Sequence, residues 1–178
     1  LIRHGLTHHN VAGRYQGWSE GELVPEHIEM LRATPFDASG YDAVYTSPLR
    51  RCTETSALLG IESPIVDARL RERSMGVFEG LNAEQCAEQH PESFAIFRQI
   101  DAPMRMPDGE TRQEHLDRVL AWVDSVRHLE HVLAFTHGGT IDFLYRLGTG
   151  HSLHGGEKVF AGGNAAMSSF ELNGDGVE

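Results

Sequence analysis

Two apolar segments, far apart in the sequence, each end in a His-Gly pair. His4-Gly5 follows Leu1-Ile2-Arg3, and His137-Gly138 follows the apolar segment 131–136. Parallel β-sheets form ligand sites at the carboxyl ends of their strands, so the two imidazoles can belong to one site. A glycine after each histidine lets a ligand approach the backbone closely, and it lets the chain turn into a helix whose first N–H groups attract anions.

Arginine side chains accompany this pattern. Arg3 precedes His4, Arg14 lies in a glycine-flanked segment, and Arg50 and Arg51 occupy the first turn of a predicted helix. Positive side chains at a helix N-terminus oppose the helix dipole, so helix stability alone does not explain them. A planar guanidinium can bind two phosphate oxygens at once. The arginines therefore indicate a phosphate site.

The elements that must position these residues follow from hydrophobic periodicity and turn residues. Short apolar segments predict strands at 1–2, 42–46, 64–67, 131–136 and 165–172. Helical spacing predicts helices at 47–59, 82–89, 92–99, 111–127 and 141–147. Ser47 is expected to be the N-cap of the first helix, Pro48 its first residue and Gly60 its stop. This alternation predicts an α/β fold, a three-layer α/β/α sandwich around a mostly parallel sheet.

Length, charge and composition restrict the class of protein. The 178 residues suit a single domain, 1–178. Asp and Glu outnumber Lys and Arg by 26 to 15, which argues against nucleic acid as a partner, and no apolar run reaches the ~18 residues of a membrane helix. Cys52 and Cys86 are expected to be buried free thiols, which with no signal peptide predicts a cytoplasmic protein. Because Leu1 already reads as a strand residue, we expect the domain to be truncated at its N-terminus.

Several short motifs follow one another in a characteristic order. They are 1–5 with Thr7 and Asn10, 13–17, 47–52 with Thr55, 70–73 with Gly76 and 79–80, 107–111, and 136–139 with Asn164 after it. This order resembles the histidine phosphatase superfamily, in its phosphoglycerate mutase-like branch, over nearly the whole chain. The resemblance aligns Arg51, not Arg50, with the family's phosphate-binding arginine.

The resemblance implies a phosphatase of small phosphomonoesters that forms a phosphohistidine intermediate. His4 is then the nucleophile, and Glu72 protonates the leaving oxygen and later activates water. The phosphate oxygens are held by Arg3, Arg51 and His137. Weaker substrate contacts are expected from Asn10, Arg14 and Gly138.

Because arginines take the place of a metal cation on the phosphate oxygens, the resemblance implies that neither a metal ion nor a cofactor is needed. It also implies that the partner is a small phosphorylated metabolite. Glu79 is the rival proton donor, and Glu72 is favoured because it occupies the family's position. His8 and His9 are adjacent, so they cannot converge on a metal ion as helical i and i+4 ligands do. They and the other histidines outside the motifs, His115 among them, are expected to be solvated.

Two alternative functions stay open. Mutases of the family carry a long insertion after the proton-donor segment, whereas here only 34 residues separate Glu72 from Pro107, which favours a phosphatase over a phosphoglycerate mutase-type phosphotransferase. A non-catalytic phosphate-binding module is the second alternative, and the presence of all the principal catalytic residues argues against it. Leu6 and the segment 20–27 depart from the family pattern, so the substrate stays open. The oligomeric state also stays open, with a homodimer as one option.

Overall fold

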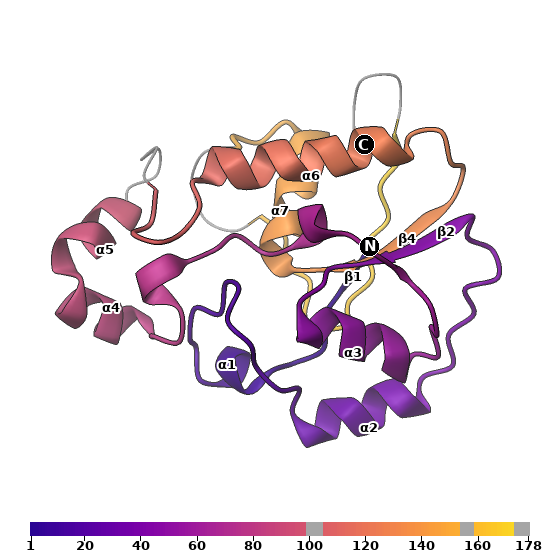
Figure 1. Cartoon of the computed structure of the whole chain (residues 1–178), viewed down its shortest axis with the longest axis horizontal. Coiled ribbons are helices and arrows are strands. Elements are labelled where there is room, and N and C mark those ends of the chain that lie inside the picture. The colour runs from indigo at the N-terminus through magenta and orange to yellow at the C-terminus, as the bar shows by residue number, and fades with distance from the viewer. Residues whose placement is uncertain (99–104, 154–158, 173–178) are drawn as a thin grey trace.

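A four-stranded parallel sheet forms the centre of the computed structural model, which describes residues 1–98, 105–153 and 159–172 (Figure 1). The strands are β1 (Ile2–Arg3), β2 (Ala43–Thr46), β3 (Ile65–Val66) and β4 (Val132–Thr136), in the order β1-β4-β2-β3. Arg3 pairs with Thr136, and Thr46 pairs with Phe135, so the carboxyl ends of these strands lie at one edge. The predicted α/β fold with a parallel sheet is confirmed.

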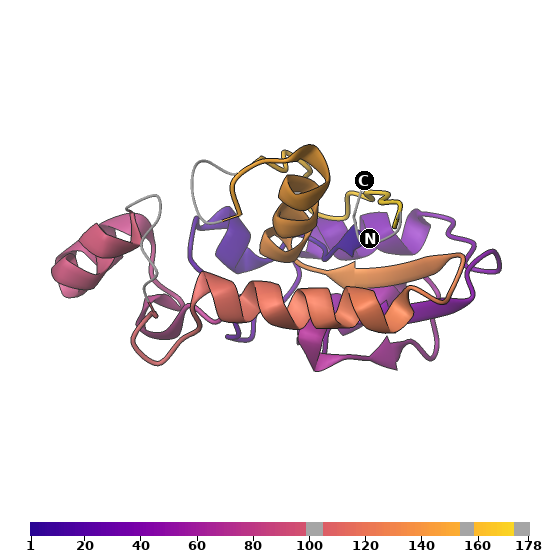
Figure 2. The ribbon, with the colours of Figure 1, turned by 90° about the horizontal axis from the view of Figure 1, so that it is seen from above.

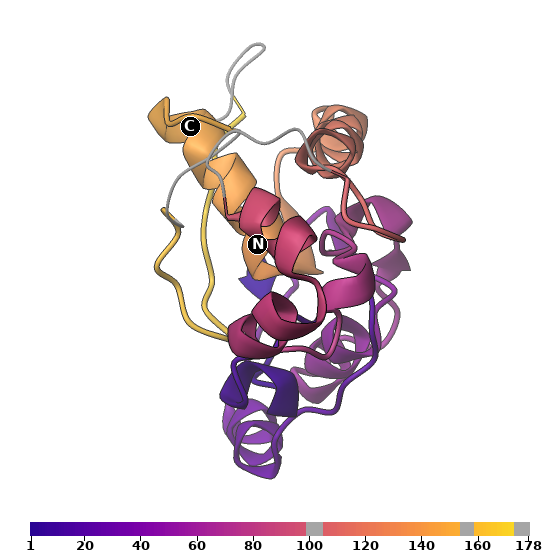
Figure 3. The ribbon, with the colours of Figure 1, turned by 90° about the vertical axis from the view of Figure 1, so that its left-hand side faces the viewer.

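Helices cover both faces of the sheet. The helices of the described residues are α1 (His8–Val11), α2 (Pro25–Ala33), α3 (Arg50–Leu58), α4 (Ala83–Gln89), α5 (Pro91–Phe97), α6 (Arg112–Val126) and α7 (Gly138–Thr149), with short 3-10 turns η1 (Ala68–Leu70) and η2 (Gly76–Phe78). Successive residues of a strand point to opposite faces. On β4, Leu133 and Phe135 pack in one cluster with α2 and α3, whereas Ala134 packs in another with α6 and α7. Figure 3 shows this layering from the side.

The helices α4 and α5 lie beyond the end of the sheet, away from the other helices (Figure 2). They have a separate apolar cluster in which Phe78, Phe94 and Met106 are buried and Tyr15 and Phe97 are partly buried. The Tyr15 and Phe97 rings pack edge to face, with their centroids 5.6 Å apart. This aromatic cluster borders the candidate site described below. Within the described part of the chain, no helix combines the length and apolar character needed to cross a membrane.

The structure corrects the predicted start of two helices. The helix expected from Ser47 begins at Arg50, with Leu49 as its N-cap. The backbone of Leu49 is extended, with a φ of -68° and a ψ of 130°, so Pro48 and Leu49 precede the helix. The Ser47 hydroxyl accepts from the Leu49 N–H, as a cap would, and also bonds to His137. The helix expected at 141–147 is longer and begins at Gly138, directly after β4.

The segment 165–172 is not the predicted strand. It forms a single antiparallel bridge, between Met167 and Ile2, although further backbone hydrogen bonds join it to β1. Ala165 has a φ of 61°, so the backbone bends where the strand was expected to begin. The helix predicted at 92–99 covers Pro91–Phe97, and residue 99 lies outside the described residues. The other predicted strands and helices are confirmed, with shifts at their ends.

Candidate active site

Polar side chains follow three neighbouring strands of the sheet at the point where each strand ends. His4 comes after β1, His137 after β4 and Ser47 after β2. Because β4 lies between β1 and β2, His137 is close to both of the other residues. Its ring centroid lies 5.2 Å from that of His4, and its Nε2 lies 2.8 Å from the Ser47 Oγ. The sheet therefore brings the two predicted histidines together.

His4 is held in one orientation by its own turn. The ring is 4% exposed, and its Nδ1 lies 2.8 Å from the Gly5 carbonyl oxygen. A carbonyl oxygen only accepts hydrogen bonds, so Nδ1 carries the proton and Nε2 keeps its lone pair in the neutral ring. The His4 N–H donates to the Thr136 carbonyl, and the Asn164 side-chain amide donates to the His4 carbonyl. Nε2 is therefore the nitrogen that can attack an electrophile.

Arg51 lies beside His137 and is almost fully buried. Its Nε donates to the His137 Nδ1 at 3.2 Å, and its two Nη atoms donate to the carbonyls of Gly17 and Ser19. Because Nδ1 accepts, the neutral His137 ring donates from Nε2 to Ser47. Burial, and then the charge of Arg51, hold the pKa of His137 well below its ordinary value. Arg51 is therefore the cation at this point, and His137 is a neutral donor.

Arg3 brings a second cation to the same edge of the sheet. Its Nη1 donates to the Gly162 carbonyl at 3.2 Å, and its Nε is buried without a hydrogen-bond partner among the described residues. Burial lowers the pKa of Arg3, and the charge of Glu72 opposes that shift. A buried N–H without a partner is costly, and an oxyanion at this position would satisfy it.

Glu72 lies on the irregular segment between η1 and η2 and reaches the start of α7. Its Oε2 accepts from the Gly139 N–H at 2.9 Å, and its Oε1 accepts from the Arg73 N–H at 3.0 Å. A Cβ atom on Gly139 would lie 2.3 Å from the Glu72 Oε1, so the close approach requires glycine there. The carboxyl group of Glu72 therefore lies beside Gly139, which is two residues after His137.

Glu79, the rival carboxylate, joins two loops. Its Oε1 accepts hydrogen bonds from the backbone N–H groups of Trp18 and Met75 and contacts the Ser74 hydroxyl. The Trp18 indole donates in turn to the Glu72 carbonyl at 2.6 Å. The contacts of Glu79 are thus those of a residue that fixes the backbone around Glu72.

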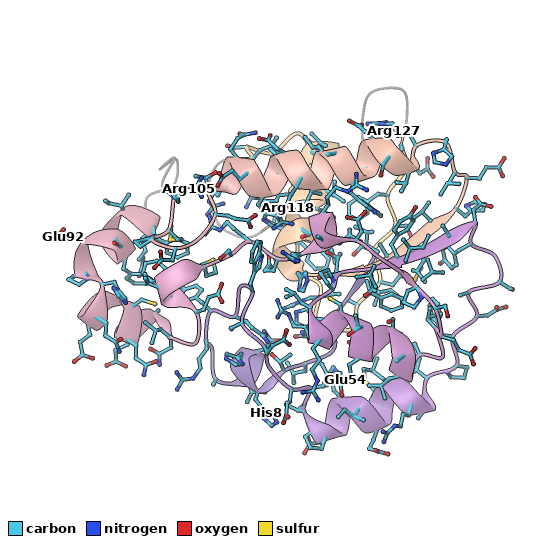
Figure 4. All side chains as sticks on the ribbon, viewed as in Figure 1. His8, Glu54, Glu92, Arg105, Arg118 and Arg127 are labelled. Carbon is cyan, nitrogen blue, oxygen red and sulfur yellow. The ribbon has the colours of Figure 1, made fainter. Side chains whose placement is uncertain are left out.

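Arg118, on α6, holds the segment that carries Glu72. It donates to the carbonyls of Arg69, Arg71 and Glu72 at 2.6–2.8 Å, and to both carboxylate oxygens of Glu110 at 2.9–3.0 Å. Figure 4 shows Arg118 on the side of α6 that faces this segment. We call these contacts the Arg118 clamp. It replaces the ladder of hydrogen bonds that a regular strand or helix would provide here.

The predicted site residues fall into two groups. His137 lies next to both Arg51 and His4, and Glu72 is close enough for its charge to act on Arg3 and Arg51. Arg14, in contrast, donates to the Gly80 carbonyl and to Gln85, which belong to the η2 and α4 side. The Asn10 side chain accepts from the Thr7 N–H at the cap of α1 and from Asn164. Gly138 contributes only backbone, as the first residue of α7.

Sequence reasoning missed several contributors to the site. The role of Ser47 as a partner of His137 was hidden by its resemblance to a helix cap, and nothing singled out Arg118.

Cys52 is a buried free thiol, as predicted, but its Sγ lies 3.5 Å from the His137 Nε2, and burial raises its pKa to about 12, so it remains a thiol. His115 is not solvated: it is buried on α6 and bonds to the Thr140 hydroxyl. Its position one turn before Val119, on the apolar stripe, was the available signal.

Comparison with known proteins identifies the family to which the chain belongs. The model of the histidine phosphatase superfamily (branch 1) matches residues 1–178. The chain is 30% identical over 183 residues to "Putative phosphoserine phosphatase 2" of Hydrogenobacter thermophilus, covering 98% of this chain and 89% of that protein. It is 30% identical over 160 residues to "Metal-independent phosphoserine phosphatase" of Arabidopsis thaliana, covering 82% of this chain and 66% of that protein. The solved structure of Bacillus stearothermophilus YhfR superimposes with a TM-score of 0.79 at 27% identity, covering 99% of this chain and 92% of that one. The chain therefore belongs to the histidine phosphatase superfamily, branch 1.

Proposed function

We propose that this chain is a metal-independent phosphatase of small phosphomonoesters, with a phosphohistidine intermediate on His4. The observation that carries the proposal is the fixed state of the His4 ring, whose Nδ1–H is bound to the Gly5 carbonyl, so that Nε2 is the nucleophilic atom. The names of the relatives support the reaction class, and phosphoserine is a candidate substrate on that ground.

The reaction has two displacement steps. In the first, Nε2 of His4 attacks phosphorus and the bond from phosphorus to the ester oxygen breaks, while Glu72, as the carboxylic acid, gives that oxygen its proton. In the second, the Glu72 carboxylate removes a proton from water, the water oxygen attacks phosphorus and the N–P bond breaks. Arg3 and Arg51 offset the charge on the phosphoryl oxygens in both steps.

Several contacts support Glu72 over Glu79 as the proton donor. Glu72 lines a cavity and contacts Gly139, which is two residues after His137. Glu79 instead uses one oxygen for the backbone N–H groups of Trp18 and Met75. The carboxyl group of Glu72 is therefore the better placed to meet a leaving oxygen.

Hydrolysis of p-nitrophenyl phosphate in the presence of a chelator tests the proposal. We expect turnover by the wild-type protein and a loss of about 10⁴-fold or more in His4→Ala. Rapid acid-free quenching should trap base-stable, acid-labile phosphate on the wild-type chain and not on His4→Ala. His8→Ala, which removes an exposed histidine, is the matched control and should label normally.

Three results would each contradict a different part of the proposal. Absence of turnover by the wild-type protein would remove the enzymatic function. A requirement for added metal would remove the metal-independent mechanism. Labelling of His4→Ala would move the nucleophile elsewhere. The single domain, the cytoplasmic location and the oligomeric state stay predictions.

A further inference from the structure

A cavity of about 550 Å³ opens beside Glu72, on the side of the site away from α3. Its lining residues come from five parts of the chain: Tyr15, Glu72, Arg73, Met75, Phe97, Arg112, His115, Gly139, Asp142, Phe143 and Arg146. The volume is that of a site for an organic molecule and exceeds what a phosphoryl group fills. On the proposed function, on which this inference rests, the alcohol portion of the ester lies next to Glu72 and therefore enters this cavity.

Two of the charged residues in the cavity are paired with each other. The Arg146 Nε donates to the Asp142 Oδ2 at 2.7 Å, and both side chains are largely buried. The second oxygen of Asp142 accepts from the N–H groups of Val159 and Phe160. Glu72 in turn accepts two backbone N–H groups, as described above. The acidic groups of the cavity are thus already bound by partners other than the Arg73 guanidinium.

Arg73 differs from these residues because its close partners are uncharged. The residue is only 9% exposed, and its Nη2 lies 3.5 Å from the Met75 sulfur. Its guanidinium carbon lies 5.4 Å from the centre of the Phe97 ring. Among the described residues, no carboxylate lies within 4 Å of it as an ion-pair partner. Burial, and then the nearby charge of Arg112, lower the pKa of Arg73 to about 10, although the charges of Glu72 and Glu110 oppose that shift, so it is still a cation at neutral pH.

A buried guanidinium with a thioether and a phenyl ring as neighbours is poorly compensated. Among the described residues, the Met75 sulfur is the one acceptor within hydrogen-bond distance of its five side-chain N–H groups. Burying such a charge is costly unless an anion binds it. Arginine is suited to that anion because its fork binds a carboxylate or phosphate in bidentate fashion.

We propose that Arg73 binds an anionic substituent on the alcohol portion of the substrate, so that the cavity selects phosphomonoesters carrying a second negative group. Tyr15, Phe97 and Phe143 surround the carbon part of that alcohol, and Arg73 binds its carboxylate or its second phosphate. Glu72 lines the same cavity and contacts Gly139, two residues after His137, so the second anion also fixes the ester oxygen beside its proton donor.

Matched substrates test the subsite in the wild-type protein. O-phosphoserine and phosphoethanolamine differ only in a carboxylate. 3-Phosphoglycerate carries a carboxylate where glycerol 3-phosphate carries a hydroxymethyl group. Fructose 1,6-bisphosphate and fructose 6-phosphate differ in a second phosphate. We expect kcat/KM to favour the more anionic member of the carboxylate pairs, of the phosphate pair or of both by about 10- to 100-fold. The pairs with the larger ratio identify the anion, and ratios near one in all three pairs would overturn the proposal.

The variant Arg73→Met assigns the preference to Arg73. It keeps the apolar stem and removes the charge, so the ratio within the preferred pair should fall to near one, and Arg73→Lys should give an intermediate ratio. Arg32→Met is the matched control, since Arg32 is 60% exposed on α2 and pairs only with Glu29 among the described residues. A large ratio that Arg73→Met leaves unchanged would overturn the role of Arg73.

Binding of sulfate esters separates the failure of the subsite from the failure of the proposed function. L-serine O-sulfate and ethanolamine O-sulfate resist this chemistry, so calorimetry measures their dissociation constants without turnover. Tighter binding of the serine ester by wild-type protein, about tenfold and lost in Arg73→Met, supports a carboxylate subsite even if p-nitrophenyl phosphate is not hydrolysed. The opposite outcome has three parts: p-nitrophenyl phosphate is hydrolysed, the two sulfate esters bind equally well, and the fructose phosphate pair shows no preference. This outcome would overturn the anion subsite but not the proposed phosphatase function.

Discussion

The two ends of the candidate site are held in place by different parts of the fold. At the phosphate end, His4, Ser47 and His137 follow directly on three adjacent strands, and the sheet fixes their backbones. At the leaving-group end, Glu72 lies on irregular chain, and side chains from other elements fix its backbone. The difference means that the phosphate end depends on the sheet itself, whereas the leaving-group end can be displaced without unfolding it.

Burial follows the same division. His4, Arg51 and His137 are at most 4% exposed and bond mainly to one another and to neighbouring backbone. Glu72 is partly exposed, and the Arg118 clamp that holds its segment is itself partly open to solvent. Changes at the leaving-group end should therefore affect catalysis in a manner that depends on the substrate, with a smaller effect on stability.

The substitution Glu72→Gln should show the largest effect at the leaving-group end. It removes the transferable proton, so kcat/KM for an alkyl phosphate such as phosphoserine, which reports the first displacement step, should fall by about 10²- to 10⁴-fold. A p-nitrophenolate leaves without a proton, so its release should be slowed much less. Steady-state kinetics with both substrates measures the two losses.

Glu79→Gln is the matched control for this prediction. Its side-chain oxygen can still accept from Trp18 and Met75, so we expect both substrates to be affected equally and weakly. Equal losses for both substrates in Glu72→Gln, or a larger alkyl-specific loss in Glu79→Gln, would make Glu79 the proton donor.

The substitution Gly139→Ala should displace Glu72 by steric contact. The added Cβ would lie 2.3 Å from the Glu72 Oε1, so the carboxyl group has to move. A displacement of about 1 Å can lower activity by about 10²-fold. We expect this loss with alkyl phosphates, measured as kcat/KM, and a smaller loss with p-nitrophenyl phosphate. Gly40→Ala is the control, because a Cβ there would have nothing within 4 Å and should leave both activities unchanged. Normal alkyl phosphate turnover by Gly139→Ala would show that Glu72 is not confined.

Arg118→Met should loosen the leaving-group end through the clamp. The variant loses the hydrogen bonds to three carbonyls and to Glu110, so the free energy of unfolding should fall by about 2 kcal/mol. The ratio of alkyl to aryl phosphate kcat/KM should also fall, by about tenfold, because Glu72 is less well positioned. Urea unfolding and kinetics measure the two effects.

Arg127→Met is the control on the same helix (Figure 4). Arg127 pairs with Asp124 at the C-terminal end of α6, so its loss should leave the ratio of alkyl to aryl phosphate kcat/KM unchanged. A fall in stability with no change of that ratio in Arg118→Met would make the clamp purely structural.

The same division explains what could be predicted from the sequence. The phosphate end was predictable because His4 and His137 end apolar strands, and a parallel sheet places such ends side by side. The strand order that puts His137 next to Ser47 was not predictable from the sequence, because it depends on pairing between strands that are far apart in the chain. Arg118 lies on α6, remote in sequence from Glu72, and its bonds go to backbone carbonyls, which leave no trace in residue types. The corrected segment 165–172 had the alternation of a strand, but the left-handed backbone at Ala165 follows from its packing beside β1.

The two ends of the site can also be compared by how the free energy of unfolding depends on pH. Each end has a buried histidine whose pKa is lowered, His115 at the leaving-group end and His137 at the phosphate end. Burial holds both pKa values well below the ordinary 6.5. As pH falls below 6.5, these residues take up protons in the unfolded chain but not in the folded one, so protonation favours unfolding. Their contribution to stability is complete above that pH. Below it, the free energy of unfolding should fall by up to about 1.4 kcal/mol per pH unit for each histidine.

The substitution His115→Gln tests this assignment through the difference from wild type. Glutamine cannot be protonated, so the destabilisation by the variant should shrink as pH falls from 7 to 5, by about 1 to 2 kcal/mol. Urea unfolding at several pH values measures it, and His8→Gln, at an exposed position, should give a difference that does not change with pH. A constant difference for His115→Gln would mean that the folded protein accepts a proton on His115. The cavity wall next to Arg73 would then carry a further positive charge at low pH, and selection for anionic substrates should strengthen as the pH falls.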